Sequence, residues 1–231
     1  MNATAPLSRR ERPAKPALTR AGIVDAAMMI LQTEGLDKVT MRRVAAALDT
    51  GAASLYVYVR DTEDLHAEVL DALIGRVLAP PRRGGWRASL KALLKRYLEL
   101  LLAHPEIAKM ALSTVPTGTN YLSLVDQILG LLIKGGAHEQ EAAWGVDLLL
   151  LSVTAQAAER SSWKRADAAI DNVERIASAI RGADPHVHPN VARLGVVLFS
   201  GGPERFEWQL DLMLTGLLMT PASRQREKAK A

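Results

Sequence analysis

The chain has 231 residues, of which 48% are hydrophobic and 23% charged, and its formal net charge is +4. This composition supports a buried core, so it disfavours a disordered or fibrous chain. Cysteine is absent, which excludes disulfide frameworks, thiolate metal sites and cysteine nucleophiles.

The positive charge is concentrated at the amino-terminal end. Residues 1–60 carry nine Lys or Arg and five Asp or Glu, whereas the remaining residues carry 20 of each kind. Within this end, residues 1–18 are predicted to form a disordered basic arm. A basic end is typical of a chain that meets a polyanion such as nucleic acid, although an ordinary solvated surface has the same pattern.

Apolar residues after the arm repeat at helical spacing, so we expect an all-α fold. Thr19 is predicted to cap a first helix that ends at Gly35. Thr40 is predicted to cap a short second helix, and residues 49–51 form a turn.

A third short helix is expected over residues 52–58, and Asp61 is expected to cap a long fourth helix that reaches Val77. The run at 79–85 contains two Pro and two Gly and predicts a loop. The helices expected after it cover residues 86–103, 105–113, 121–134, 139–163, 168–181, 189–199 and 203–219, before a disordered tail at 222–231.

Two of these helices, at 139–163 and 203–219, are apolar around most of their circumference. A helix of that kind in a water-soluble chain needs more than one buried face. We therefore expect these two helices to be buried against a second copy, which predicts a homodimer.

The second and third helices, with the three-residue turn between them, have the length of a helix-turn-helix. Its outer face presents Ala52, Ala53, Tyr56 and Val57, which are small enough for the backbone to enter a major groove. Phosphate contacts are expected from Thr40, Arg42, Tyr56 and Tyr58. The alternative is that the tyrosines are core aromatics of a small bundle and that Arg42 and Arg43 form a solvated face.

Residues 19–65 resemble the DNA-binding module of the TetR family of bacterial transcriptional regulators. The resemblance is carried by Gly35, Thr40, Leu55-Tyr56, Tyr58-Val59 and Glu63-Asp64-Leu65. It implies a three-helix DNA-binding domain at the amino-terminal end and a helical ligand-binding and dimerisation domain over residues 66–221. The DNA contacts that it implies are Thr40, Arg42, Ala52, Ala53, Ser54, Tyr56, Val57, Tyr58 and Thr62.

Two positions depart from the family pattern. The turn has Asp49-Thr50 where Gly-Val is usual, which is tolerable because Asp accepts unusual backbone angles. Thr62 stands where a Lys usually binds phosphate. The loss of that charge predicts a shallower salt dependence of DNA binding, unless Arg60 or the basic arm substitutes for it.

The second half resembles, more loosely, the carboxy-terminal domain of tetracycline repressors. The matching features are Trp86, His104, residues 112–116 and Gly135-Gly136, in the same order and at similar spacing. This chain has Ala111 where tetracycline repressors have a magnesium-binding His, and Leu93 where they have a drug-binding Asn. The resemblance therefore does not imply tetracycline–magnesium as the inducer.

A small-molecule pocket is expected among the helices that begin near residues 61, 86, 121 and 139. A few polar or aromatic groups in an apolar cleft are the usual chemistry of such a site. The same residue types at helical spacing also form ordinary cores. The candidate lining residues are Leu93, Tyr97, Met110, Thr114, Trp144 and Asp147.

Other classes of function find little support. His186 and His188 lie two residues apart in a loop and lack a third ligand, so no metal or other cofactor is predicted. Phosphate-cradling glycine loops, nucleophile elbows and HExxH motifs are absent, so an enzyme is not expected. Without a secretory signal or an apolar run of the roughly 18 residues that span a bilayer, we expect a cytoplasmic chain with no membrane partner.

These features together predict a ligand-responsive regulator, most simply a repressor, which binds a palindromic double-stranded operator as a homodimer. A small apolar or amphipathic effector is expected to release it by moving the fourth helix. The alternative is a helical interaction protein whose helix-turn-helix only packs. Binding of the protein to its own upstream DNA would separate the two.

Overall fold

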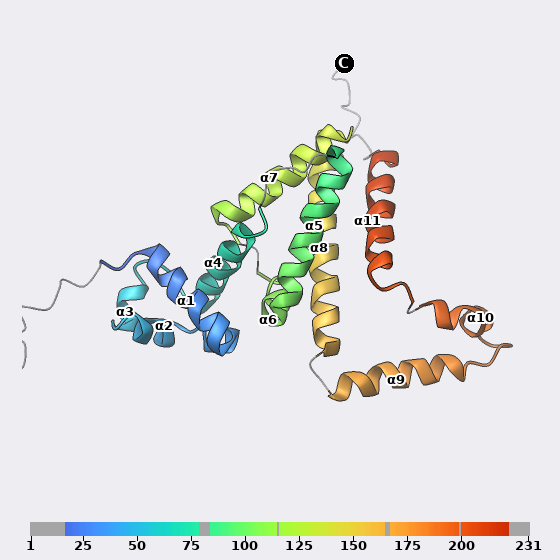
Figure 1. Cartoon of the computed structure of the whole chain (residues 1–231), viewed down its shortest axis with the longest axis horizontal. Coiled ribbons are helices and arrows are strands. Elements are labelled where there is room, and N and C mark those ends of the chain that lie inside the picture. The colour runs from blue at the N-terminus through green and yellow to red at the C-terminus, as the bar shows by residue number, and fades with distance from the viewer. Residues whose placement is uncertain (1–16, 79–83, 115, 165–166, 199, 222–231) are drawn as a thin grey trace, which may run out of the picture. The chain divides into compact units, whose positions relative to one another are not determined.

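The computed structural model describes residues 17–78, 84–114, 116–164, 167–198 and 200–221, with backbone alone for 161–164 and 167–173. Every regular element in these ranges is a helix, so the predicted all-α fold is confirmed (Figure 1). None of the described helices has the length and apolarity that crossing a membrane requires. The α-helices are α1 (Arg20–Glu34), α2 (Met41–Ala47), α3 (Ala52–Leu55), α4 (Thr62–Gly75), α5 (Gly85–Ala103), α6 (Pro105–Met110), α7 (Thr119–Lys134), α8 (Glu139–Lys164), α9 (Asp167–Arg181), α10 (Pro189–Leu198) and α11 (Gly202–Met219), and η1 (Leu36–Lys38) is a 3₁₀ turn.

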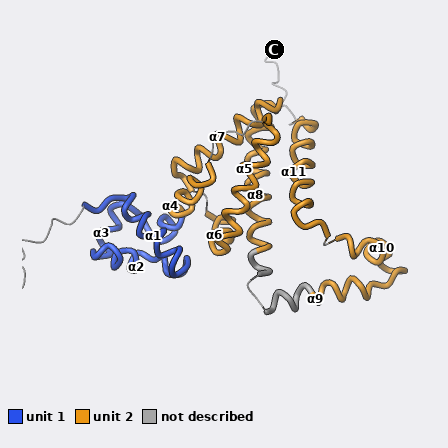
Figure 2. The backbone as a smooth tube through the Cα atoms, in the orientation of Figure 1, with its two compact units in different colours: residues 1–66 blue, residues 67–231 orange. Residues whose placement is uncertain are grey.

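The chain divides into two compact units, residues 1–66 and 67–231 (Figure 2). The division falls inside α4, between His66 and Ala67. The predicted tail and most of the predicted arm lie outside the described residues.

The caps predicted for unit 1 are confirmed. The Thr19 hydroxyl accepts a hydrogen bond from the Gly22 amide, and the Thr40 hydroxyl accepts one from the Arg43 amide. Gly35 ends α1 with a φ of 90°, an angle that a residue with a Cβ rarely adopts. Each of these residues satisfies or redirects backbone groups that a helix end leaves without partners.

The third helix is shorter than predicted. It ends at Leu55, and residues 56–58 form a turn instead of continuing to Tyr58. The Tyr58 and Val59 amides both donate to the Leu55 carbonyl, so the last turn tightens and the helix stops. Before α3, Asp49 has a φ of 49°, in agreement with the expectation that Asp tolerates the turn.

Helix ends in unit 2 shift by a few residues from the predicted positions. α4 ends at Gly75 rather than Val77, and α6 ends at Met110 rather than Ser113. The following residues form turns in which amides donate three residues back, from Val77 to Ile74 and from Ser113 to Met110. Phe199, the predicted end of α10, lies outside the described residues.

Helix α8 is the centre of unit 2. It packs against α5, α6 and α7 on one side and against α11 on another (Figure 1). Its buried side chains include Leu149, Val153 and Ala157, and α5 and α7 contribute Leu94, Leu101 and Leu124, among others. α9 and α10 lie outside this bundle and pack on each other, where a Cβ at Gly195 would overlap the Ile180 side chain.

The amino-terminal end of α7 is held by a carboxylate from α4. Buried Asp71 accepts hydrogen bonds from the Tyr121 amide (2.8 Å) and from the Asn120 side-chain amide (3.0 Å). Gly118, the N-cap of α7, has no side chain to cap the helix, so Asp71 does this from a neighbouring helix. A Cβ at Gly118 would overlap the Asp71 carboxylate, and one at Gly75 would lie 2.9 Å from Asn120 Oδ1.

We therefore expect Gly118→Ala to destabilise the protein by about 1–3 kcal/mol because the added methyl overpacks this junction. Gly130→Ala is the matched control in the same helix, since nothing lies within 4 Å of its Cβ position. That control should stabilise α7 by about 0.5–1 kcal/mol. Urea unfolding of the two variants tests the prediction. An equal gain in stability for both would show that α4 and α7 are not in close contact.

Candidate functional site

The helix-turn-helix of unit 1 is held by a small apolar core. α2 packs against α3, and α1 packs against α2. Val44 and Ala45 of α2 and Leu55 of α3 are buried, and small Ala45 permits a close approach of the helices. The arrangement leaves one side of the α3 segment in solvent.

That solvent-facing side carries most of the predicted groove-facing residues. The Tyr56 side chain is 56% exposed and the Val57 side chain is 80% exposed. Ala53 and Ser54 are also exposed, whereas Ala52 is half-buried. Tyr56 and Val57 are therefore not core residues of the bundle, which removes the alternative interpretation of Tyr56.

Tyr58 has a different environment. Its hydroxyl donates to the Leu18 carbonyl (2.7 Å). Its own carbonyl accepts two hydrogen bonds from the Arg20 guanidinium, from Nε at 3.1 Å and from the terminal nitrogen at 2.6 Å. The single hydroxyl proton is thus used inside unit 1, where Tyr58 positions the segment in this conformation.

The predicted phosphate contacts before and after α3 are placed as follows. Arg42 is exposed, and Thr62 is half-buried as the first residue of α4. The Thr40 hydroxyl accepts from the Arg43 amide and keeps its proton for a further acceptor. Arg43 is paired with Glu34, and this pairing raises the pKa of Arg43 and lowers the pKa of Glu34.

Arg60 and His66 are committed to contacts inside unit 1. The Arg60 guanidinium lies 3.1 Å from the Asp64 carboxylate, and its hydrogen bond to that carboxylate lowers the pKa of Asp64. His66 Nε2 donates to the Val39 carbonyl (2.8 Å), which connects the start of α4 to the residue before Thr40. Sequence spacing did not indicate this His66 contact, because 27 residues separate its partners.

Unit 2 contains a polar cluster inside its helical bundle. Tyr97 of α5 is buried, and its hydroxyl lies 3.2 Å from the Thr154 hydroxyl of α8, which is also buried. Burial raises the pKa of Tyr97, so the phenol stays neutral and available as a hydrogen-bond donor at physiological pH.

Half-buried Tyr121 of α7 lies near this pair, whereas Asp147 of α8, which lies near Tyr121, is exposed. Burial, followed by the nearby Asp147 carboxylate, raises the pKa of half-buried Tyr121. The nearby Tyr121 also raises the pKa of Tyr97. The sequence predicted Tyr97 and Asp147 as lining residues but not Tyr121 or Thr154, although a Thr within the apolar run of α8 is a polar signal that was available.

The other predicted ligand residues are distributed more widely. Leu93 is fully buried in the core, and Met110 and Thr114 are half-buried at and after the end of α6. Trp144 lies on the outer face of α8 with 61% of its side chain exposed. The structure thus separates Trp144 from the buried Tyr97.

Trp144 instead lines an open groove between α8 and α11. The groove has a volume of about 570 Å³, and the two helices come so close beside it that a Cβ at Gly145 would overlap Leu217. Its lining is mainly apolar and includes Trp144, Leu148, Met213 and Leu217. This is the face that the sequence predicted to be buried by a second copy.

The two loop histidines do not form a metal site with the rest of the described chain. His186 and His188 are exposed between α9 and α10. No cluster of three or more potential ligands occurs among the described residues.

Comparisons with known families match both units. The family described as "Bacterial regulatory proteins, tetR family" matches residues 23–69, and the family described as "Tetracyclin repressor-like, C-terminal domain" matches residues 79–220. The chain is 30% identical over 242 aligned positions to the HTH-type transcriptional repressor DrrR1 of Streptomyces coeruleorubidus, covering 96% of this chain and 85% of that protein.

Solved structures agree with this assignment. A Streptomyces coelicolor transcription regulator superposes with a TM-score of 0.76 at 44% identity, covering 90% of this chain and 98% of the other. The TetR family protein ActR of the same organism, in complex with actinorhodin, gives a TM-score of 0.77 at 35% identity, covering 88% and 96% of the two chains. The predicted class of protein, a ligand-responsive transcriptional regulator with a DNA-binding helix-turn-helix, is confirmed. The chain belongs to the TetR family of bacterial regulatory proteins.

Proposed function

We propose that this chain represses transcription by binding a palindromic operator as a homodimer, and that an amphipathic aromatic effector releases it. The observation that carries this proposal is the exposed side of the α3 segment, where Tyr56 and Val57 face solvent on a rigidly held turn. Two such segments, carried by two copies, would enter successive major grooves about 34–36 Å apart on one face of the duplex.

Tyr56, Arg42 and Thr40 are the proposed phosphate contacts, and Thr62 adds a hydroxyl at the start of α4. Arg42 is exposed and forms no ion pair with the described residues, so its charge is free for a phosphate. Val57 and Ala53 are proposed to meet the base edges, with Ser54 and Ala52 beside them. Tyr58 is proposed to support this surface from within rather than to contact the duplex.

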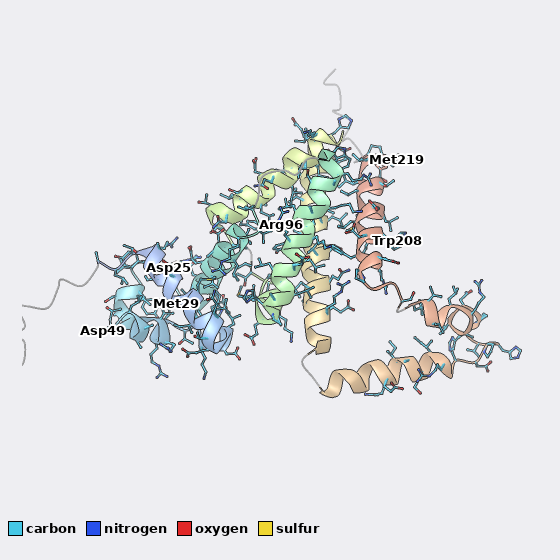
Figure 3. All side chains as sticks on the ribbon, in the orientation of Figure 1. Asp25, Met29, Asp49, Arg96, Trp208 and Met219 are labelled. Atoms are coloured by element: carbon cyan, nitrogen blue, oxygen red, sulfur yellow. The ribbon has the colours of Figure 1, made fainter. Side chains whose placement is uncertain are left out.

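The proposed dimer face is formed by α8 and α11. Trp144, Leu148 and Leu151 on α8 are exposed, as are Trp208, Leu212 and Met219 on α11, where Figure 3 shows Trp208 and Met219 along the helix. A group of six large exposed apolar side chains on two helices that pack together is typical of an interface between subunits. Ion pairs from Lys91 of α5 to Glu207 and Asp211 hold α11 in place.

The proposed effector site is the cluster around Tyr97 and Thr154. The two hydroxyls and Tyr121 offer donors and acceptors within a largely apolar bundle, a combination that suits an aromatic molecule with a few polar groups. ActR, which is 35% identical, was solved in complex with actinorhodin. We propose actinorhodin as the first probe of this site.

Tyr56→Ala is expected to lower operator affinity at least tenfold because it removes a phosphate contact worth about 1.5–3 kcal/mol. Its thermal stability should be unchanged, since the Tyr56 side chain is largely exposed. Tyr58→Phe is the contrasting variant and should lose about 1 kcal/mol of stability with its bond to Leu18. Gel shifts and thermal unfolding measure both quantities. Unfolding of the Tyr56→Ala variant would mean that Tyr56 is structural.

Leu148→Glu is expected to dissociate the dimer because it places a charge in the apolar groove between α8 and α11. Ile133→Glu is the matched control, since Ile133 is similarly exposed but lies on α7 outside the groove lining. Light scattering after size exclusion gives the mass of each variant. A monomeric parent protein, or equal dissociation of both variants, would refute this interface.

Tyr97→Phe is expected to weaken actinorhodin binding about tenfold, since it deletes one buried hydroxyl without changing the packing. Operator affinity without actinorhodin should stay the same. Ser113→Ala, which removes an exposed hydroxyl outside the cluster, should change neither quantity. Calorimetric titration gives the affinity for actinorhodin, and a gel shift with added actinorhodin gives release from DNA. A Tyr97→Phe variant with parental actinorhodin affinity would place the effector elsewhere.

A further inference from the structure

The surface that unit 1 presents at α3 is poor in side chains that read base edges by hydrogen bonding. From Gly51 to Val59 the sequence contains no Arg, Lys, Asn, Gln, Asp or Glu. These are the side chains that read guanine, adenine and cytosine in the major groove through paired or single hydrogen bonds. The segment therefore lacks the usual direct means of recognising those three bases.

The hydroxyls on this segment do not fill the gap. The Tyr58 hydroxyl donates to Leu18, and the exposed Tyr56 hydroxyl is assigned above to a phosphate. Ser54 is exposed, but a serine hydroxyl both donates and accepts and so discriminates little between bases. Specific reading by this segment must therefore rely on its apolar groups.

Val57 is the most prominent of these apolar groups. Its neighbours Leu55 and Val59 are buried, whereas Val57 is 80% exposed. The turn that presents it is fixed on one side by the two Arg20 bonds to the Tyr58 carbonyl and on the other by the buried Leu55. Tyr56 keeps a helical backbone conformation (φ −63°, ψ −13°), so Ala53, four residues before Val57, lies on the same side.

We infer that Val57, assisted by Ala53, is a specificity-determining residue that contacts the 5-methyl groups of thymines in each operator half-site. This inference rests on the proposed binding of an operator. Thymine is the only unmodified base that offers an apolar methyl group in the major groove. The base pairs facing Val57 and Ala53 are therefore A·T pairs, with the thymine methyl against the side chain.

The test begins with the full chain and a library of random duplexes, from which the bound sequence is selected. Each thymine of the selected half-sites is then replaced by deoxyuridine, which removes the methyl and leaves base pairing unchanged. We expect about a fourfold loss of affinity for each methyl that Val57 or Ala53 covers. Deoxyuridine in the flanking sequence should have no effect.

Val57→Ala connects the effect to the side chain. The variant should bind the thymine operator more weakly than the parent and should lose most of its sensitivity to deoxyuridine. Met29→Ala is the matched control, because Met29 on α1 is also an exposed apolar residue at 61%, and it should retain both the affinity and the sensitivity. The parent measurement with deoxyuridine stands even if a variant folds poorly.

The possible failures are distinguishable. Selection of no preferred duplex would overturn the proposed operator binding and this inference with it. Selection of an operator whose affinity is unchanged by deoxyuridine would overturn the inference alone. Full sensitivity to deoxyuridine in Val57→Ala would show that another residue reads the methyl groups.

Discussion

The proposed DNA-binding surface depends on the hydrogen bonds that Tyr58 forms with Leu18 and Arg20 at the start of α1. α3 has four residues, far fewer than a helix needs to persist by its own backbone bonds. The buried Leu55 side chain anchors α3 in the core of unit 1. The turn that follows is fixed by the bond from Arg20 to the Tyr58 carbonyl and by the bond from the Tyr58 hydroxyl to the Leu18 carbonyl. Because these contacts hold both the backbone and the side chain of Tyr58, its neighbours Tyr56 and Val57 face solvent in a defined orientation. A surface that is fixed before it meets DNA loses less conformational entropy on binding.

A long-range hydrogen-bonded contact also occurs in unit 2, where a carboxylate of α4 caps α7. Asp71 accepts bonds at the start of α7, and the glycines at 75 and 118 allow the close approach. Hydrogen bonds therefore connect Asp71 of α4 to the start of α7. Near the start of α4, His66 is hydrogen-bonded to the Val39 carbonyl within unit 1. A displacement of α7 would change the position of Asp71, which gives a physical basis for proposing α4 as the element that responds to an effector.

Local chemistry made the helices and their caps predictable from sequence, whereas the long-range polar contacts were not. Thr19, Thr40 and Gly35 act within a few residues of their own helix ends, so their patterns are visible in the sequence. Tyr58–Leu18, Asp71–Tyr121 and Tyr97–Thr154 join residues 40, 50 and 57 positions apart. No spacing rule connects such pairs. The contact of Tyr58 inside unit 1 was missed for this reason, since its aromatic type was visible in the sequence but its partner was not.

The same limit explains why the predicted ligand residues Tyr97 and Trp144 lie in different places, one inside the bundle and the other in the groove beside α11. α8 places Thr154 towards Tyr97 in the bundle and Trp144 and Leu148 towards the groove beside α11. Residue type alone does not reveal which side of a helix with two apolar faces is internal. In the proposed homodimer this division has a mechanical consequence, because one continuous helix carries both an effector contact and the subunit interface. A change in the packing around Tyr97 would therefore act directly on the helix that sets how the two copies, and with them the two recognition segments, are held.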